Sequence, residues 1–205
     1  MGHGLGDTPA VIILKARAGT NADNSWYCWH KGLSSGYNIR LDRNNGELNT
    51  SSAASGVIAA PTNTTTFGFT AGSNVLNVNE NTTTYIAYCF AEVEGYSKFG
   101  SYTGNGNADG PFIATSFSPQ FIILKKSESG GNGDWIIKDT ARDPYNVSDK
   151  DLRANVTNAE GTGSARNIDI LSNGFKLRTS DGDYNDNANS FIYMAFTSTI
   201  VTGKR

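Results

Sequence analysis

The sequence PAVIILK occupies residues 9–15, and the similar sequence PQFIILK occupies residues 119–125. Each is a short apolar run that follows a proline and ends at a lysine. Apolar runs of this length, rich in β-branched side chains and bounded by turn-forming residues, are typical of β-strands. The pair therefore predicts the same strand twice, 110 positions apart.

The repetition continues along the chain. Four further blocks match in the same order, at offsets between 106 and 111: Trp26 with Trp135, Leu41 with Leu152, Phe67 with Phe175, and TYIAYCF (84–90) with SFIYMAF (190–196). Self-similarity in a constant order indicates a duplicated structural unit. We expect a first β repeat over residues 1–95 and a second over residues 96–205.

The rest of the sequence predicts turns and strands. Asn, Ser, Thr and Gly make up 84 of the 205 residues and separate short apolar bursts. No segment of a dozen residues keeps a helical apolar stripe, so we expect very little helix, with one turn near residues 149–154. The predicted fold class is all-β, as two tandem β-sandwich repeats of jelly-roll-like form.

The two repeats differ at their beginnings. The second repeat contains FGSYTGNG (99–106) and PFI (111–113) before its PQFIILK block, whereas only residues 1–8 precede PAVIILK. The first repeat is therefore expected to lack its initial strands. It either dispenses with them or receives them from upstream sequence or a neighbouring chain, and an exposed sheet edge would be a site for strand pairing.

Charge and hydropathy exclude two classes of partner. The formal net charge is -2 and only 18% of residues are charged, so a nucleic-acid-binding surface is not expected. No apolar run approaches the roughly 18 residues of a membrane-spanning helix, so membrane insertion is not expected either. Cys28 and Cys89 lie in aromatic strand-like runs, which favours buried free thiols over a disulfide.

The sequence offers no catalytic constellation. His3 and His30 are the only histidines and lack a metal-binding spacing, and no G-x-S-x-G motif occurs. Glu92 and Glu94 follow a predicted strand and alternate to one face, as the two acids of a glycosidase would. Because Ser198 takes the place of Glu92 in the second repeat, we expect no enzyme and no catalytic residue, and a glycosidase is the weakest alternative.

An acidic loop is the one candidate metal site. Asp181, Asp183 and Asp186 offer carboxylates at close spacing, the oxygen ligands that Ca²⁺ prefers. The loop is not an EF-hand, because Ile192 stands where the closing Glu would be. A polar turn and a structural Ca²⁺ site both remain open, and no other cofactor is expected.

Two tyrosines are candidates for glycan binding. Tyr145 and Tyr184 lie in polar loops, where an outward ring would stack on a sugar face while Asn and Asp bind its hydroxyls. Trp26 and Trp135 occupy matching places in the repeats, which suits a shared packing role instead.

Four stretches carry a family resemblance: HGLG (3–6) running into PAVIILK with HKGL (30–33) after it, YIAYCFAEVEGYSKFGSYTGNG (85–106), RDPYNV (142–147) and LSNGFKLR (171–178). From His3 to about Phe196 the chain resembles a domain family of tail-fibre and other virion structural proteins of marine bacteriophages. Members of that family are large modular proteins, often with lectin-like sandwich modules beside the shared domain.

The resemblance implies a non-enzymatic structural protein of a bacteriophage virion, from a tail fibre or appendage. It would lie on the particle surface or tail, associate with itself and other virion proteins, and have a host-surface glycan as a further partner. A carbohydrate-binding module and a self-polymerising surface filament are the alternatives.

Overall fold

The structure of the chain is a computed structural model that describes residues 1–19, 25–49, 57–70, 78–79, 81–128 and 131–198. Almost all regular structure in these residues is β-strand, which confirms the all-β prediction. The helical segments are one turn, α1 (Gly182–Asn185), and a 3-10 turn at Ser164–Arg166. The predicted helical turn at 149–154 is wrong, because this segment contains a short strand.

Two antiparallel five-stranded sheets form the centre of the molecule. The first sheet has the order β4-β3-β2-β1-β7, with strands β1 (Val11–Ala18), β2 (Tyr27–His30), β3 (Tyr37–Arg40), β4 (Leu48–Asn49) and β7 (Thr84–Phe90). The second sheet has the order β12-β11-β10-β15-β8, with strands β8 (Ser97–Thr103), β10 (Phe121–Lys126), β11 (Trp135–Asp139), β12 (Leu152–Arg153) and β15 (Ser190–Phe196).

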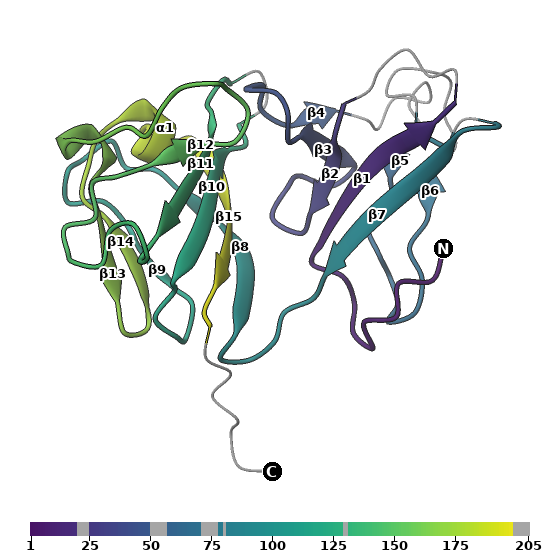
Figure 1. Cartoon of the computed structure of the whole chain (residues 1–205), viewed down its shortest axis with the longest axis horizontal. Coiled ribbons are helices and arrows are strands. Elements are labelled where there is room, and N and C mark those ends of the chain that lie inside the picture. Colours follow the sequence, from purple (N-terminus) through teal and green to yellow (C-terminus); the bar gives the residue numbers. More distant parts are fainter. Residues whose placement is uncertain (20–24, 50–56, 71–77, 80, 129–130, 199–205) are drawn as a thin grey trace, which may run out of the picture.

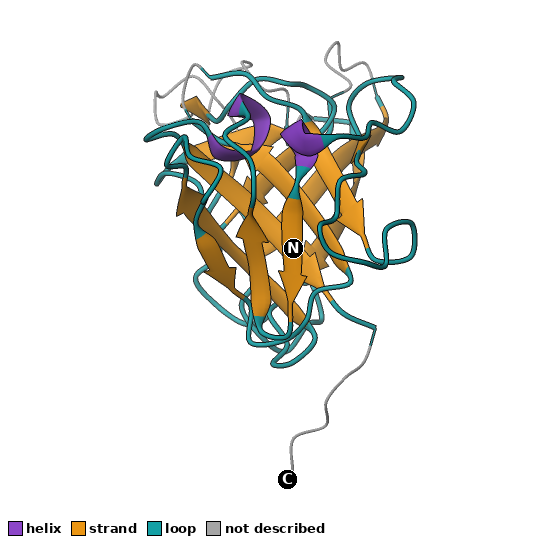
Figure 2. Cartoon of the chain, turned by 90° about the vertical axis from the view of Figure 1, so that its left-hand side faces the viewer, coloured by secondary structure: helices purple, strands orange, loops and turns teal. Residues whose placement is uncertain are grey.

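A small sheet lies outside each large one (Figure 1). The first small sheet pairs β5 (Val57–Ile58) with β6 (Phe69–Thr70), and the second has the order β13-β14-β9, with strands β9 (Phe112–Ala114), β13 (Ile168–Leu171) and β14 (Gly174–Leu177). Figure 2 shows that strands of successive layers cross one another, and that both helical segments lie at the same end of the molecule.

Apolar side chains fill three interfaces between these layers. One cluster lies between the first sheet and its small sheet, one between the second sheet and its small sheet, and the middle one joins the two large sheets. The middle cluster combines Val11 and Ile39 with Phe99, Trp135 and Ile192. Each large sheet is thus covered on both faces, which explains why β1 reads as an unbroken apolar run instead of an alternating one.

Strand register repeats between the large sheets. Val11 pairs with Phe90 as Phe121 pairs with Phe196. The correspondence of Leu41 with Leu152, expected from the sequence, is wrong. Leu152 lies opposite Ile137 in the second sheet, and the equivalent pair in the first sheet is Ile39 opposite Cys28. The division into sandwich repeats at 1–95 and 96–205 stays a prediction, and residues 199–205 lie outside the described part.

The strands expected only in the second repeat are β8 and β9. Strand β8 pairs with all of β15, whereas no described strand lies on the corresponding side of β7. The place of β9 is taken in part by Met1 and Gly2. The amide of Phe67 donates a hydrogen bond to Met1 O at 3.0 Å, and Gly2 forms a β-bridge with Thr66. In the second sheet the equivalent of Phe67 is Phe175, which pairs with Ile113 in β9.

Polar contacts also hold the two large sheets together. The amide of Gly46 donates to Gly131 O at 2.7 Å, and the indole Nε1 of Trp135 donates to Arg40 O at 2.9 Å. Lys125, a buried side chain, donates from Nζ to Asn44 O at 2.9 Å and to Gly133 O at 2.7 Å. Among the described residues, no helix has the length and apolar character to cross a membrane.

Candidate functional site

Strand β7 ends the first sheet with seven residues, all of them uncharged. Phe90 O accepts a hydrogen bond from the amide of Ala10 at 2.7 Å. The main-chain groups of Phe90, and of every second residue before it in the strand, therefore face β1. By the alternation of an antiparallel strand, the N–H and C=O groups of Ala87 and Cys89 face the other way. In the described part of the chain that side carries no paired strand, and β7 presents an edge ready for pairing.

The side chains of β7 are far more exposed than their counterparts in β15. Ile86 is 37% exposed and Tyr88 is 45% exposed, whereas Ile192 and Met194 at the same register positions are 1% and 3% exposed. The ring of Tyr88 stacks on Trp26 with centroids 6.2 Å apart. We call Trp26, Ile86 and Tyr88 the edge patch.

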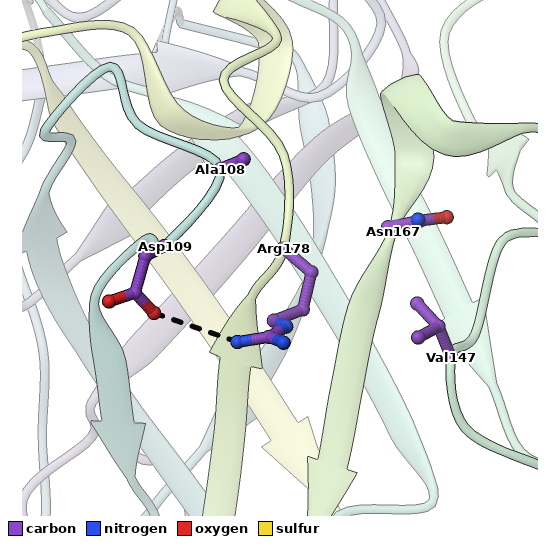
Figure 3. A pocket seen from close by; sticks show the side chains of 5 residues that line it. All are labelled: Ala108, Asp109, Val147, Asn167 and Arg178. Carbon is purple, nitrogen blue, oxygen red and sulfur yellow. Dashed lines mark ion pairs between the residues drawn. The ribbon is translucent and has the colours of Figure 1, made fainter.

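A pocket of about 470 Å³ opens beside the second small sheet, lined by Ala108, Asp109, Val147, Asn167 and Arg178 (Figure 3). The Arg178 side chain extends toward Asp109, and the ion pair spans 3.6 Å. Hydrogen bonding from Lys176, at 2.9 Å, is the main cause that holds the pKa of Asp109 below its ordinary value. The pocket therefore combines fixed charges and an amide with two small apolar groups.

Tyr145 stands outward, as expected, with 81% of its surface exposed. The following residue is fixed on β13, because Asn146 Nδ2 donates to Ile170 O at 2.7 Å and the amide of Ile170 donates to Asn146 Oδ1 at 2.8 Å. Val147, one residue further, lines the pocket. An exposed aromatic ring thus lies two residues along the chain from a residue that lines the pocket.

The expected outward position of Tyr184 is wrong. Its side chain is fully buried, and Oη donates to Asp151 Oδ2 at 2.7 Å. Burial raises the pKa of the phenol, and the negative charge of Asp151 adds to the effect. The turn α1 points the ring into the core beneath the second sheet, so Tyr184 is unavailable for sugar stacking.

The three loop carboxylates have separate internal partners. Asp181 Oδ1 accepts from the amide of Asp183 and caps α1. Asp183 pairs with Arg153 at 2.9 Å, and Asp186 pairs with Lys126 at 2.6 Å. Within the described ranges, no group of three or more His, Cys, Asp or Glu side chains is placed to hold a metal ion, so these three carboxylates do not converge on one point there.

A buried ionic network adjoins Tyr184. Asp151, 1% exposed, accepts from Arg166 Nε at 3.0 Å as well as from Tyr184. Lys138 Nζ donates to Ser148 O at 3.2 Å and to Arg166 O at 2.5 Å. Burial lowers the pKa of Lys138 to about 8. Because each member has protein partners, this network serves to fix loops on the second sheet.

Glu92, one of the two acids weighed for a glycosidase, is held by ion pairs and a main-chain hydrogen bond. Glu92 pairs with Lys31 at 2.6 Å and Lys98 at 3.2 Å, and it accepts from the amide of Phe99 at 3.1 Å. Burial alone would raise the pKa of Glu92, but these hydrogen bonds outweigh it and hold the pKa below its ordinary value. Although Glu92 and Lys31 line a pocket of about 340 Å³, a general acid needs the opposite shift.

Both cysteines are free thiols, as expected, and they face different layers. Cys28 belongs to the middle cluster, whereas Cys89 packs toward the first small sheet. Burial raises the pKa of Cys28 to about 12 and also raises the pKa of Cys89.

Several residues were not predicted from the sequence: the edge patch, the pocket residues Asp109, Asn167 and Arg178, and the buried Lys125 and Lys138. Two signals were available: the first repeat lacks the stretch that precedes PQFIILK in the second, and each buried lysine follows an apolar run. The pocket residues come from separate loops and strands, so no local pattern announces them.

Over residues 1–199 the chain matches a protein family described as a domain of unknown function, DUF7483. No curated protein and no solved structure matches it.

Proposed function

The chain belongs to the DUF7483 family, and we propose, from the features of the molecule, that it is a non-enzymatic structural protein of a bacteriophage virion. Its place would be a tail fibre or similar appendage, where copies associate with one another and with other virion proteins. The resemblance to phage fibre domains over residues 3–196 supports this assignment.

The edge strand β7 is the observation that carries the proposal. It presents seven uncharged residues at the end of a sheet, with an apolar patch beside them. Natural edge strands that remain monomeric are usually short, bulged, charged or covered. A long neutral edge is the kind of surface on which sheet-based assemblies are built.

Immuno-electron microscopy of purified particles tests the proposal. An antibody raised against this chain should label the tail or its appendages, and mass spectrometry of the same particles should recover its peptides. Particles that contain no trace of the chain would refute a virion role. Antibody against a known capsid protein of the same particles provides the positive control.

A second candidate, a carbohydrate-binding module, is favoured by the exposed ring of Tyr145, which lies two residues along the chain from the pocket residue Val147. Aromatic stacking together with carboxylate, amide and guanidinium groups suits a sugar with several hydroxyls. On a glycan array, Tyr145→Ala should abolish any binding and Tyr145→Phe should keep it, because stacking needs only the ring. Tyr88→Ala, on the edge patch, is the matched control and should bind as the wild type does.

A further inference from the structure

We propose that β7 pairs antiparallel with β7 of a second copy of this chain, across a two-fold axis at Ala87, so that two first sheets become one continuous sheet. This inference rests on the self-association in the proposed function, and it names the partner, the surface and the register.

The second sheet shows what a strand at this position does. Strand β8 pairs with β15 along its whole length, from Ser97 opposite Phe196 to Thr103 opposite Ser190. Because β7 is paired with β1 in the same register as β15 with β10, the main-chain groups of Ala87 and Cys89 face outward as those of Tyr193 and Ala195 face β8. The place beside β7 is therefore shaped for one antiparallel strand.

The small side chain at the centre of β7, Ala87, leaves room for the same residue of a second chain. In the second sheet Tyr193 lies opposite Gly100, where an added Cβ would come within 2.8 Å of Tyr193 Oη. The register equivalent of Tyr193 in the first sheet is Ala87. A small residue here leaves room for a side chain on the incoming strand, and Ala87 of a second copy fits that requirement.

A two-fold axis at Ala87 also matches the other face of the strand. Residues placed symmetrically about the axis become neighbours, so Ile86 of each copy lies opposite Tyr88 of the other. Aromatic and β-branched side chains form favourable cross-strand pairs. Two exposed edge patches would thereby cover each other, which removes from water the apolar groups that are 37% and 45% exposed in the single chain.

Within the described residues, the other edges of the two large sheets are less suited to such pairing. Strand β8 carries a charged residue, Lys98, and the outer strands β4 and β12 have two residues each. Strand β7 is long, neutral and self-complementary. Because the same surface serves both copies, the contact closes as a dimer and does not propagate into a filament.

Disulfide trapping tests the register. In a Cys89→Ser background, Ala87→Cys places two thiols opposite each other with Cα atoms about 5.5 Å apart, within disulfide range. Mild oxidation should convert most of this variant into a covalent dimer. The matched control Ser101→Cys, exposed on β8, should stay monomeric in the same background.

Charge exchange tests the surface independently. A double lysine variant, Ile86→Lys with Tyr88→Lys, should raise the dimer dissociation constant by about a hundredfold, because like charges face each other across the axis. The double glutamate variant, Ile86→Glu with Tyr88→Glu, should behave in the same way. An equimolar mixture should restore the dimer in sedimentation experiments, and circular dichroism should show that all variants are folded.

Several results would overturn the inference: a wild-type chain that stays monomeric, cross-linking through position 101 instead of 87, or a mixture of charged variants that remains monomeric. Binding of a peptide of residues 97–103 to a monomeric wild-type chain would show that the edge takes a donated strand, not a second copy. Electron microscopy separates the two proposals. If the particles contain the chain but the Ala87→Cys variant forms no disulfide-linked dimer, the dimer alone is refuted. If the variant forms the dimer but the particles contain no chain, the virion role alone is refuted.

Discussion

The imidazole Nε2 of His30, on β2, lies 3.0 Å from the main-chain oxygen of Tyr193, on β15. The other ring nitrogen, Nδ1, accepts a hydrogen bond from the amide of Gly32 at 2.9 Å. These two contacts require a neutral ring that carries its proton on Nε2, and the residue is fully buried. His30 thus joins the two large sheets through Nε2–H, whereas a second proton, on Nδ1, would break the hydrogen bond from Gly32.

Stability should fall as the pH falls from 6.5 toward 4.5. Burial lowers the pKa of His30 to about 4, from an ordinary 6.5, and the nearby Lys31 lowers it further while Tyr193 and Glu92 oppose this. Between these values the unfolded chain takes up a proton that the folded chain refuses, so acid favours unfolding. The full shift corresponds to about 3 kcal/mol. Urea unfolding at several pH values should show the slope, and His30→Gln should lose most of it; an unchanged slope in that variant would contradict the assignment.

Substitutions at Asp151 should be far more costly than the loss of its tyrosine partner. Asp151→Asn leaves Arg166 and Lys138 without their buried counter-charge and should lower the free energy of unfolding by about 3 to 5 kcal/mol. Tyr184→Phe removes one hydrogen bond and should cost about 1 to 2 kcal/mol. Thermal and urea unfolding give both values, and equal effects would show that the charge is not what matters.

The two thiols should differ in reactivity. Cys28 is fully buried and its raised pKa leaves almost no thiolate at neutral pH, whereas Cys89 lies half-buried on the edge strand. A thiol reagent should therefore label Cys89 in the folded protein and Cys28 only after unfolding. Cys89→Ser identifies the reactive site by mass spectrometry, and fast labelling that persists in this variant would contradict the burial of Cys28.

Calcium should leave the melting temperature unchanged, to within about 1 °C, relative to a chelator. Asp183 and Asp186 are neutralised by Arg153 and Lys126, and Asp181 caps α1, so the carboxylates have no common point at which to hold a cation. Differential scanning fluorimetry in each condition measures this. A rise of several degrees with Ca²⁺ would show that the loop rearranges to bind it.

The sequence predicts the strands of this fold better than their arrangement. The paired apolar blocks at 9–15 and 119–125 become β1 and β10, and the blocks at 84–90 and 190–196 become β7 and β15. Which faces of the two large sheets meet was not predicted, although unbroken apolar runs in β1 and β10 are what doubly covered strands require. Periodicity shows that both faces are apolar, but not which layer covers each.

The misplaced site residues have a common physical cause. Tyr184 and the aspartates near it lie in a segment rich in polar residues, which predicts exposure by composition alone. The short turn α1 reverses this locally, since it turns Tyr184 inward to Asp151, which comes from another loop. Long-range partners such as Arg153 for Asp183 are equally invisible in local sequence, whereas Tyr145, without such a partner, was placed correctly.

The pairing of β8 with β15 has a consequence for the newly made chain. Strand β8 is synthesised directly after β7, but its partner is the last strand of the second sheet. At about 5 to 20 residues per second, translation of the roughly ninety intervening residues takes about 5 to 20 seconds. Throughout this time the ribosome-bound chain carries β8 without its partner. The pairing of β8 with β15 can therefore form only after the last strand of the second sheet has been made.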